Sequence, residues 1–280
     1  MRLSMFAPFV FAAASVLLAA PVVAQEVGEI TGQVTAEGIP VVPIAVPDAV
    51  ATGEANAVAA EIIETVRYDL DFSGYFDIVA PRLYELVPPP EGSEPRYDEW
   101  RSIGADSLLQ LDVGYRDGRI DVVARLYDLP GKKVLFAYRY GGEFELLRRI
   151  AHQVSDDLVQ HFTGTPGIAL TWIAFSSKHG EDSKELFLMD YDGRRIRRLT
   201  TTGTLNITPA WSPIADVLAF MSWREKQPAI YLLDGDGKLS KAPALTSELS
   251  AAPEWSPDGR RMVYSGDAEG QLDLYPVSYT

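Results

Sequence analysis

Two stretches of the chain carry apolar residues at the three-and-four spacing of an amphipathic helix. The first spans residues 55–70 and the second spans residues 144–162. The apolar positions of the first are Ala55, Val58, Ala59, Ile62, Ile63, Val66 and Leu70. Those of the second are Phe144, Leu147, Ile150, Ala151, Val154, Leu158 and Phe162. Each stretch predicts a helix that buries one face.

Short apolar or alternating runs surround these helices and predict strands. The first helix lies between VVPIAVP, at residues 41–47, and YFDIV, at residues 75–79. Before the second helix come SLLQLDVGY, IDVVARLYD and VLFAYRY, and Asp117-Gly118 between the first two is a strong hairpin signal. We expect an α+β domain over residues 41–165, in which two main helices cover a mixed sheet.

The pattern changes after the linker TGTPG, at residues 163–167, where short strand-like runs replace the helical spacing and begin to repeat. The runs IAFSS, LAFMS and MVYSG recur 45 and 44 residues apart, and ELFLMDYDG matches AIYLLDGDG. The repeat motif comprises Trp211, Ser212 and Pro213 in one copy and Trp255, Ser256, Pro257, Asp258 and Gly259 in the next. A period of this length with several strands per unit predicts an all-β propeller.

In each predicted blade, Trp-Ser ends the first strand and Ser-Pro-Asp-Gly makes the turn, because proline presets φ and glycine accepts a positive φ. We expect blades at roughly residues 168–210, 211–254 and 255–280. Residues 166–280 correspond to about 2.6 blades, whereas closed propellers typically have four to eight. The sequence therefore predicts an incomplete propeller and a chain that is a fragment.

The N-terminus has the three parts of a secretory signal peptide. Met1 and Arg2 precede the apolar run LSMFAPFVFAAASVLLAA, and small residues stand at Val22 and Ala24. We expect residues 1–24 to be removed by cleavage after Ala24, in preference to an uncleaved anchor helix. Residues 25–40, QEVGEITGQVTAEGIP, have weak periodicity and predict an extended tail without a core of its own.

Composition narrows the possible partners and chemistry. The 280 residues include 39 acidic and 25 basic side chains, for a net charge of −14. This balance argues against nucleic acid as a partner, because nucleic acid is bound through an excess of lysine and arginine. Cysteine is absent, which excludes disulfides, a thiolate nucleophile, cysteine-based metal sites and a lipid-anchored form.

Catalytic and metal-binding patterns are weak or missing. The sequence has no His-Glu-x-x-His, Gly-x-Ser-x-Gly or P-loop pattern, so we expect no enzyme activity and no cofactor. We expect His152 and His161 on the surface of the second helix and His179 in a loop.

Two acidic runs resemble the start of a calcium loop. They are Asp190-Tyr-Asp-Gly and Asp234-Gly-Asp-Gly, and neither has the closing glutamate. Hairpin turns are therefore the favoured interpretation, and no metal site is expected. The run RRIRR, at residues 194–198, fits a solvated strand edge better than an anion site.

Taken together, these features resemble the TolB family, the periplasmic components of the Tol–Pal cell-envelope system. The resemblance rests on the signal peptide, the tail before PIAVP, the segments GYFDIV and GADSLLQLDV, and the repeats with WSPDGRR. It implies an α/β domain followed by a six-bladed propeller that this chain would not complete. One departure is SPIAD after Trp211, where Ile214 weakens the turn motif.

The resemblance also implies a function as an adaptor that links TolA to the lipoprotein Pal. Such an adaptor maintains outer-membrane integrity and helps to constrict the envelope during cell division. Pal would bind the propeller, which some bacteriocins also exploit, and association with membranes would be peripheral, through Pal and TolA. The tail would bind TolA, here through Glu26, Val27, Ile30, Thr31 and Val34.

Two other function classes remain open from the residues alone. Similar propellers gate some exported serine peptidases, and a nucleophile-elbow motif beyond Thr280 would favour that class, although the N-terminal domain argues against it. The second alternative is a propeller that binds a sugar or metabolite, which a ligand screen would support.

Overall fold

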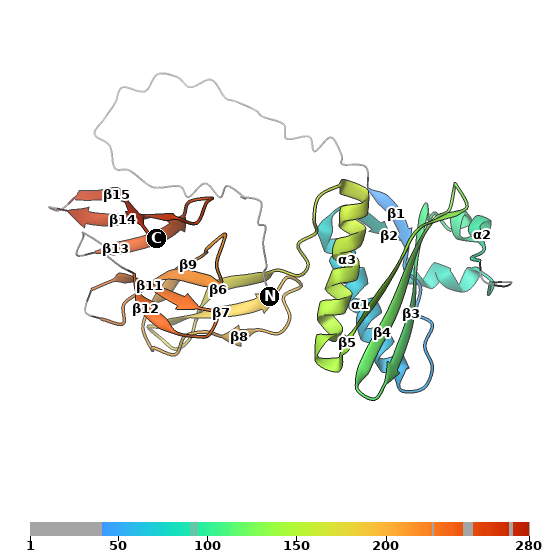
Figure 1. Ribbon diagram of the computed structural model, residues 1–280, viewed down its shortest axis with the longest axis horizontal. Coiled ribbons are helices and arrows are strands. Elements are labelled where there is room, and N and C mark those ends of the chain that lie inside the picture. The colour runs from blue at the N-terminus through green and yellow to red at the C-terminus, as the bar shows by residue number, and fades with distance from the viewer. Residues whose placement is uncertain are drawn as a thin grey trace, which may run out of the picture. The chain divides into compact units, whose positions relative to one another are not determined.

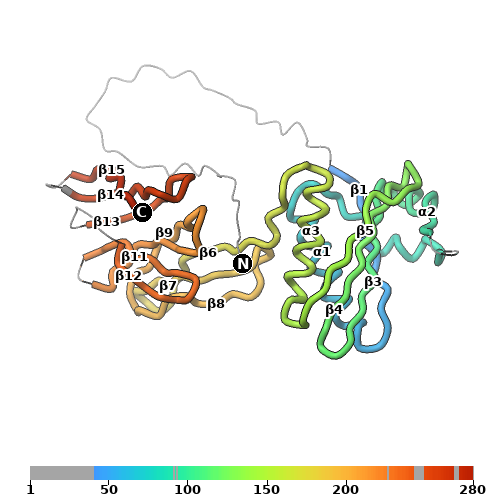
Figure 2. Tube along the Cα trace, viewed as in Figure 1, coloured from blue at the N-terminus to red at the C-terminus, as the bar shows by residue number. Residues whose placement is uncertain are grey.

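The computed structural model describes residues 41–90, 92, 94–225, 227–242, 249–268 and 271–279. The predicted signal peptide and tail, with the proposed TolA-binding residues, lie outside the described residues. The chain divides into two compact units, whose path is traced in Figure 2. The N-terminal unit extends to Trp172 and includes Asp190–Arg194, whereas the propeller unit comprises Ile173–Met189 and the residues from Arg195 onward. The predicted boundary at residue 165 stays a prediction.

A mixed five-stranded sheet forms the centre of the N-terminal unit, with strand order β2-β1-β3-β4-β5. Its strands are β1 (Val42–Ala45), β2 (Phe76–Ile78), β3 (Ser107–Arg116), β4 (Arg119–Asp128) and β5 (Lys133–Glu143). Strand β1 runs parallel to both β2 and β3, and β3, β4 and β5 form an antiparallel meander. The predicted α+β class with a mixed sheet is confirmed.

Helices α1 (Ala55–Ser73) and α3 (Leu147–Thr163) cover one face of this sheet (Figure 1). The short 3₁₀ helix η2 (Phe144–Leu146) precedes α3, so the α-helix begins three residues later than the apolar spacing predicts. Both helices end at a glycine with φ of 74°, Gly74 and Gly164, a left-handed conformation that is common at helix C-termini. The core between helices and sheet includes Ile62, Val66, Leu70, Leu109, Leu111, Val122, Leu126, Ile150, Val154 and Leu158.

The other face of the sheet is covered at one end by η1 (Pro81–Leu86) and α2 (Tyr97–Ser102) (Figure 1). Trp100 of α2 is buried there with Leu108 and Tyr127, whose neighbours in the strands point to the helix-covered face. Strands β3 and β4 therefore each contribute to two cores, which fixes their register.

The propeller unit consists of three antiparallel sheets within the described residues. They have the strand orders β6-β7-β8, β12-β11-β10-β9 and β13-β14-β15. The strands are β6 (Trp172–Lys178), β7 (Lys184–Asp190), β8 (Arg197–Arg198), β9 (Asn206–Trp211), β10 (Val217–Ser222), β11 (Ala229–Asp234), β12 (Leu239–Lys241), β13 (Ser250–Trp255), β14 (Arg261–Ala268) and β15 (Gln271–Ser278). The predicted propeller with about 2.6 blades is confirmed in its class and extent, because one sheet has four strands and two have three.

The two tryptophans of the repeat each end the first strand of a sheet and pack toward the preceding sheet. Trp211 packs against the hydrophobic cluster that contains Leu186 of β7. Trp255 packs against the cluster that contains Ala219 of β10, and its indole N–H donates to the Ala210 carbonyl at 3.1 Å. The strands β9 and β13 therefore belong with the sheets that follow them.

The turn after Trp255 has the chemistry that its sequence predicts. The Gly259 N–H donates to the Ser256 carbonyl at 2.8 Å, and Gly259 has φ of 65°. Asp258 accepts hydrogen bonds from the Ser256 hydroxyl and the Arg260 N–H, and these donors hold the pKa of its carboxyl below the usual range. A serine, a carboxylate and a glycine thus fix one tight turn between strands.

Replacing Gly259 with alanine should destabilise the propeller unit by about 2–4 kcal/mol. The positive φ strains any side chain, and the added Cβ would collide with the Ile214 side chain of the neighbouring sheet. Amide hydrogen exchange in β14 measures the loss. In an Ile214→Ala background the cost should fall to about 1–2 kcal/mol, whereas an equal cost in both backgrounds would show that Ile214 does not contribute.

Candidate functional site

Buried charged groups gather between the two helices of the N-terminal unit. Helix α3 contributes Arg148 and His152, and α1 contributes Thr65 and Asp69. Each pair is separated by four residues, so both members of a pair lie on one helical face. All four are less than 9% exposed, and Asp69 and His152 are 1% and 2% exposed. We call these residues, together with Asp190 and Asp192, the Arg148 cluster.

The turn Asp190–Arg194 supplies the remaining two members. The Gly193 N–H donates to the Asp190 carbonyl at 2.9 Å, and Gly193 has φ of 78°, so the run forms the hairpin turn that its sequence predicts. Asp190 and Asp192 alternate with Tyr191, and both carboxylates are buried, at 5% and 8% exposure. The turn, which belongs to the N-terminal unit, therefore places two buried carboxylates beside helices α1 and α3.

The guanidinium of Arg148 is the centre of the cluster. Its Nε donates to Asp190 Oδ2 at 3.4 Å, its Nη1 donates to Thr65 Oγ1 at 3.2 Å, and its Nη2 donates to Asp192 Oδ2. Charge-assisted hydrogen bonds of this kind are stronger than neutral ones. One arginine thus connects α3, α1 and the turn.

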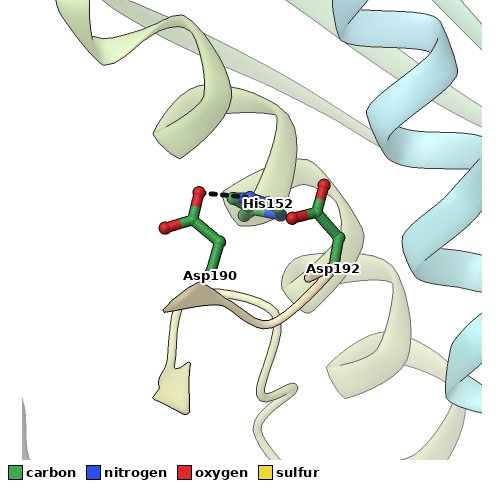
Figure 3. Close-up of side chains that lie close together, drawn as sticks. All are labelled: His152, Asp190 and Asp192. Carbon is green, nitrogen blue, oxygen red and sulfur yellow. Dashed lines mark ion pairs between the residues drawn. The ribbon is translucent and has the colours of Figure 1, made fainter. Parts of the chain in front are cut away.

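His152 lies between the carboxylates of Asp190 and Asp192 (Figure 3) and beside the guanidinium of Arg148. Its Nδ1 is 2.8 Å from Asp69 Oδ2, and its Nε2 is 3.9 Å from Asp190 Oδ2 and 3.5 Å from Arg148 Nη2. The prediction that His152 lies on the helix surface is wrong, because the ring faces α1 and the turn. His161, on the same helix, is exposed as predicted and touches Phe136 and Phe162.

His152, Asp190 and Asp192 have the ligand types of a metal site, and one ligand atom of each lies within 4.8 Å of the others. Arg148, however, already pairs with both carboxylates and lies 3.5 Å from the imidazole Nε2. A metal ion would have to displace this guanidinium and would then leave a buried, unpaired cation. The arrangement is therefore a guanidinium-centred ion cluster, in which the arginine takes the place of a metal.

Side chains around the turn extend its contacts with α1. Arg194 pairs with Glu64, and the Tyr191 ring meets Phe72 edge to face at 5.1 Å. Burial, followed by the nearby Asp69 and Asp156 carboxylates, raises the pKa of Tyr191 to about 12. Tyr191 is therefore uncharged at neutral pH.

The pKa of Asp192 reflects the balance of forces in the cluster. Burial alone would raise the pKa of Asp192, but hydrogen bonds from Arg148 and from the Arg194 backbone outweigh it and hold the pKa below its usual range. A depressed pKa means that Asp192 stabilises the fold above the unfolded-state pKa. This contribution is lost as the pH falls through the folded-state pKa.

Asp156, one turn beyond His152 on α3, binds the segment that follows the helix. Its carboxylate accepts hydrogen bonds from the N–H groups of Ala169 and Leu170 at 2.7 and 3.1 Å. Burial is the largest influence on this carboxyl and, against these two donors, raises its pKa from 3.8 to about 6. A raised pKa makes the protonated form the stabilising one.

The N-terminal unit should therefore lose about 1–3 kcal/mol of stability as the pH rises from about 4 to about 6. The stabilisation by protonated Asp156 is complete below the unfolded-state pKa of 3.8. It is lost as the pH rises through the folded-state pKa of about 6. Hydrogen exchange of β3 and β4 amides across this range measures the loss. Asp156→Asn should remove this step and Asp157→Asn should retain it; a step of the same size in Asp156→Asn would assign it to another group.

The structure brings few of the sequence-predicted site residues together. Trp211 and Trp255 lie in different sheets, and the tail is outside the described residues. Arg197 and Arg198 form the exposed edge strand β8, as the sequence predicts. In the described part of the chain, the helices are too short or too polar to cross a membrane.

Comparison with known proteins gives two family matches in a defined order. The TolB amino-terminal domain matches residues 30–135, and the TolB beta propeller domain matches residues 159–279. A Tol-Pal system protein TolB from Geobacter sulfurreducens is 34% identical over 65% of this chain and 42% of its own length. One from Paramagnetospirillum magneticum is 29% identical over 81% of this chain and 51% of its own length. The chain thus spans about half the length of these curated relatives.

A solved structure has the same fold. The crystal structure of TolB from Acinetobacter baumannii superimposes with a TM-score of 0.73 and 23% identity, covering 86% of this chain and 58% of that one. The two family matches, in the order of the two units described above, agree with this likeness. On this evidence, the chain belongs to the TolB family.

Proposed function

We propose that the chain acts in the periplasm as a non-catalytic adaptor of the Tol–Pal system. The observation that carries this proposal is the order of the family matches, with a TolB amino-terminal domain before a TolB propeller. The curated relatives with which the chain aligns are named Tol-Pal system proteins. Export would follow from cleavage of the signal peptide after Ala24.

In this proposal the tail, residues 25–40, binds TolA. The tail directly precedes β1, which lies in the sheet of the N-terminal unit. Its sequence has no core-forming periodicity and contains three glutamates and no basic residue. The contact residues would be Glu26, Val27, Ile30, Thr31 and Val34.

The propeller, in the same proposal, binds the lipoprotein Pal. A propeller presents the loops of all its sheets on two faces, which suits it to protein recognition. Bacteriocins that enter through this system would use the same surface. By linking TolA and Pal, the adaptor would maintain outer-membrane integrity and support envelope constriction during division.

Deleting Glu26–Gly38 should abolish TolA binding, because it removes every proposed contact while leaving the described residues intact. Isothermal titration of the purified chain with the periplasmic part of TolA, from the same organism, measures the affinity. We expect saturable binding for the parent chain and at least a hundredfold weaker binding for the deletion.

A scrambled tail of the same composition is the matched control, because it keeps length and charge and changes only order. It should bind as weakly as the deletion if TolA recognises a specific sequence. Hydrogen exchange of β3 and β4 should be unchanged in both variants. Undiminished TolA affinity after the deletion would remove the assignment of the tail.

A further inference from the structure

The Arg148 cluster contains more negative than positive charge. The cluster has three buried carboxylates, Asp69, Asp190 and Asp192, and one guanidinium, which pairs with Asp190 and Asp192. The imidazole of His152 is the only other basic group among the described members of the cluster, and it is charged only when it is protonated. Buried charges are stable only when they are paired, so a proton on His152 would bring the cluster nearer to neutrality.

One carboxylate oxygen in this region has no partner. Among the described residues, no hydrogen-bond donor reaches Asp69 Oδ1, although Asp69 is only 1% exposed. Its other oxygen holds the ring of His152 through Nδ1 at 2.8 Å. An incompletely satisfied buried carboxylate favours a positive charge on its neighbour. Asp69 thus provides an observation, independent of the charge count, that points to a bound proton.

The ring of His152 has two alternative partners on its other side. A neutral ring that donates from Nδ1 to Asp69 can accept from Arg148 Nη2, 3.5 Å away, through Nε2. A protonated ring instead donates from Nε2 to Asp190 Oδ2, now 3.9 Å away. The neutral ring contacts only its own helix and α1, whereas the protonated ring pairs with the turn.

We propose that Asp69, His152 and Asp190 form a buried proton-binding site whose occupancy controls the docking of the turn Asp190–Arg194 on α1 and α3. The ligand is a proton from solvent, which binds the lone pair of Nε2. Uptake of this proton adds an ion pair between His152 and the turn, so the docked turn is favoured on the acidic side. The charged groups near the ring are Asp69 from α1, Arg148 and Asp156 from α3, and Asp190 and Asp192 from the turn.

The positive charge of Arg148 disfavours protonation of His152, but the nearby carboxylates favour it more strongly. Its guanidinium would repel an imidazolium at the 3.5 Å separation of Nη2 and Nε2. Its charge is already shared between Asp190 and Asp192, and Asp69 is on the far side of the ring from it. Protonation therefore changes the sum of the cluster charges from minus two to minus one.

The test joins two pH titrations of the full chain. Ring nitrogen NMR signals report the protonation of His152, and hydrogen exchange of the Arg194 amide reports docking, because this N–H donates to Asp192 Oδ1 at 3.1 Å. After correction for the intrinsic pH dependence of exchange, protection of this amide should fall at least tenfold as His152 loses its proton. Core amides of β10 and β11, in the propeller unit, serve as the reference and should not show this step.

Variants separate a proton switch from a purely structural role. His152→Asn should reduce the step to less than twofold, whereas His161→Asn, on the exposed part of the same helix, should retain it. Asp190→Asn should also reduce it. A full step in His152→Asn would overturn the proposal. If His152→Asn does not fold, the two titrations of the parent chain decide. A protection step whose midpoint lies more than one pH unit from the midpoint of the His152 titration would also overturn the proposal.

Discussion

Arg148→Ala should lower the free energy of unfolding of the N-terminal unit by about 3–5 kcal/mol, because it removes the guanidinium that pairs with the buried carboxylates of Asp190 and Asp192. This loss is a large part of the 5–15 kcal/mol that typically stabilises a domain. Hydrogen exchange of the α1 and α3 amides in the full chain measures it. Arg148→Lys should recover only part of the loss, since an ammonium cannot reproduce three bonds in a planar fork.

The cause of this loss can be separated from lost packing. Arg148→Met combined with Asp190→Asn and Asp192→Asn removes both signs of charge, so most of the stability should return. Arg149→Ala, at the adjacent position of α3, is the matched control and should cost less than about 1 kcal/mol. A loss under 1 kcal/mol for Arg148→Ala, or no recovery in the triple variant, would show that the ion cluster does not stabilise the unit.

Glu185→Ala should destabilise the propeller unit by about 2–4 kcal/mol. Glu185 is 1% exposed and accepts hydrogen bonds from the Thr200 hydroxyl, the Gly203 N–H at 2.7 Å and the Asn206 amide at 3.1 Å. Asn206, which is fully buried, in turn accepts from the Ser222 hydroxyl at 2.7 Å. The carboxylate therefore connects β7 to β9 and, through Asn206, to β10, and its removal leaves several donors unsatisfied.

Two further variants define the role of the carboxylate. Glu185→Gln keeps one acceptor oxygen and introduces a competing donor, so it should cost about half as much as alanine. Glu181→Ala, in the exposed loop before β7, should change stability by less than about 0.5 kcal/mol. Urea unfolding, monitored by hydrogen exchange of the Leu186 and Gly203 amides, compares the stabilities of these variants. Equal stability of the Glu185 and Glu181 variants would contradict the network.

Local patterns in the sequence were sufficient to predict most of the fold. The apolar spacing from Ala55 to Leu70 predicts α1 because one face of that helix meets the sheet. Asp117-Gly118 predicts the β3–β4 hairpin because both residues adopt positive φ, 52° and 77°. The tryptophan repeat predicts where each propeller sheet begins, because each tryptophan ends the first strand of its sheet and packs toward the preceding sheet.

The Arg148 cluster could not be predicted in the same way. Asp69 and His152 are 83 residues apart in the chain, and Arg148 and Asp192 are 44 apart. A polar residue on a helix is ordinarily solvated, so the residue type alone does not distinguish His152 from the exposed His161. The available signal was the four-residue spacing of polar groups on the apolar side of both helices, at Thr65 and Asp69 and at Arg148 and His152.

Photo-cross-linking in cells tests the proposed adaptor function most directly. A photoreactive phenylalanine analogue at Val27, Ile30 or Val34 places the probe in the tail, and the same analogue at Leu86, which is 68% exposed on η1, is the control. The proposal predicts a cross-linked product with TolA from the tail positions and none from Leu86. No TolA product from any tail position, with the protein exported and folded, would contradict it.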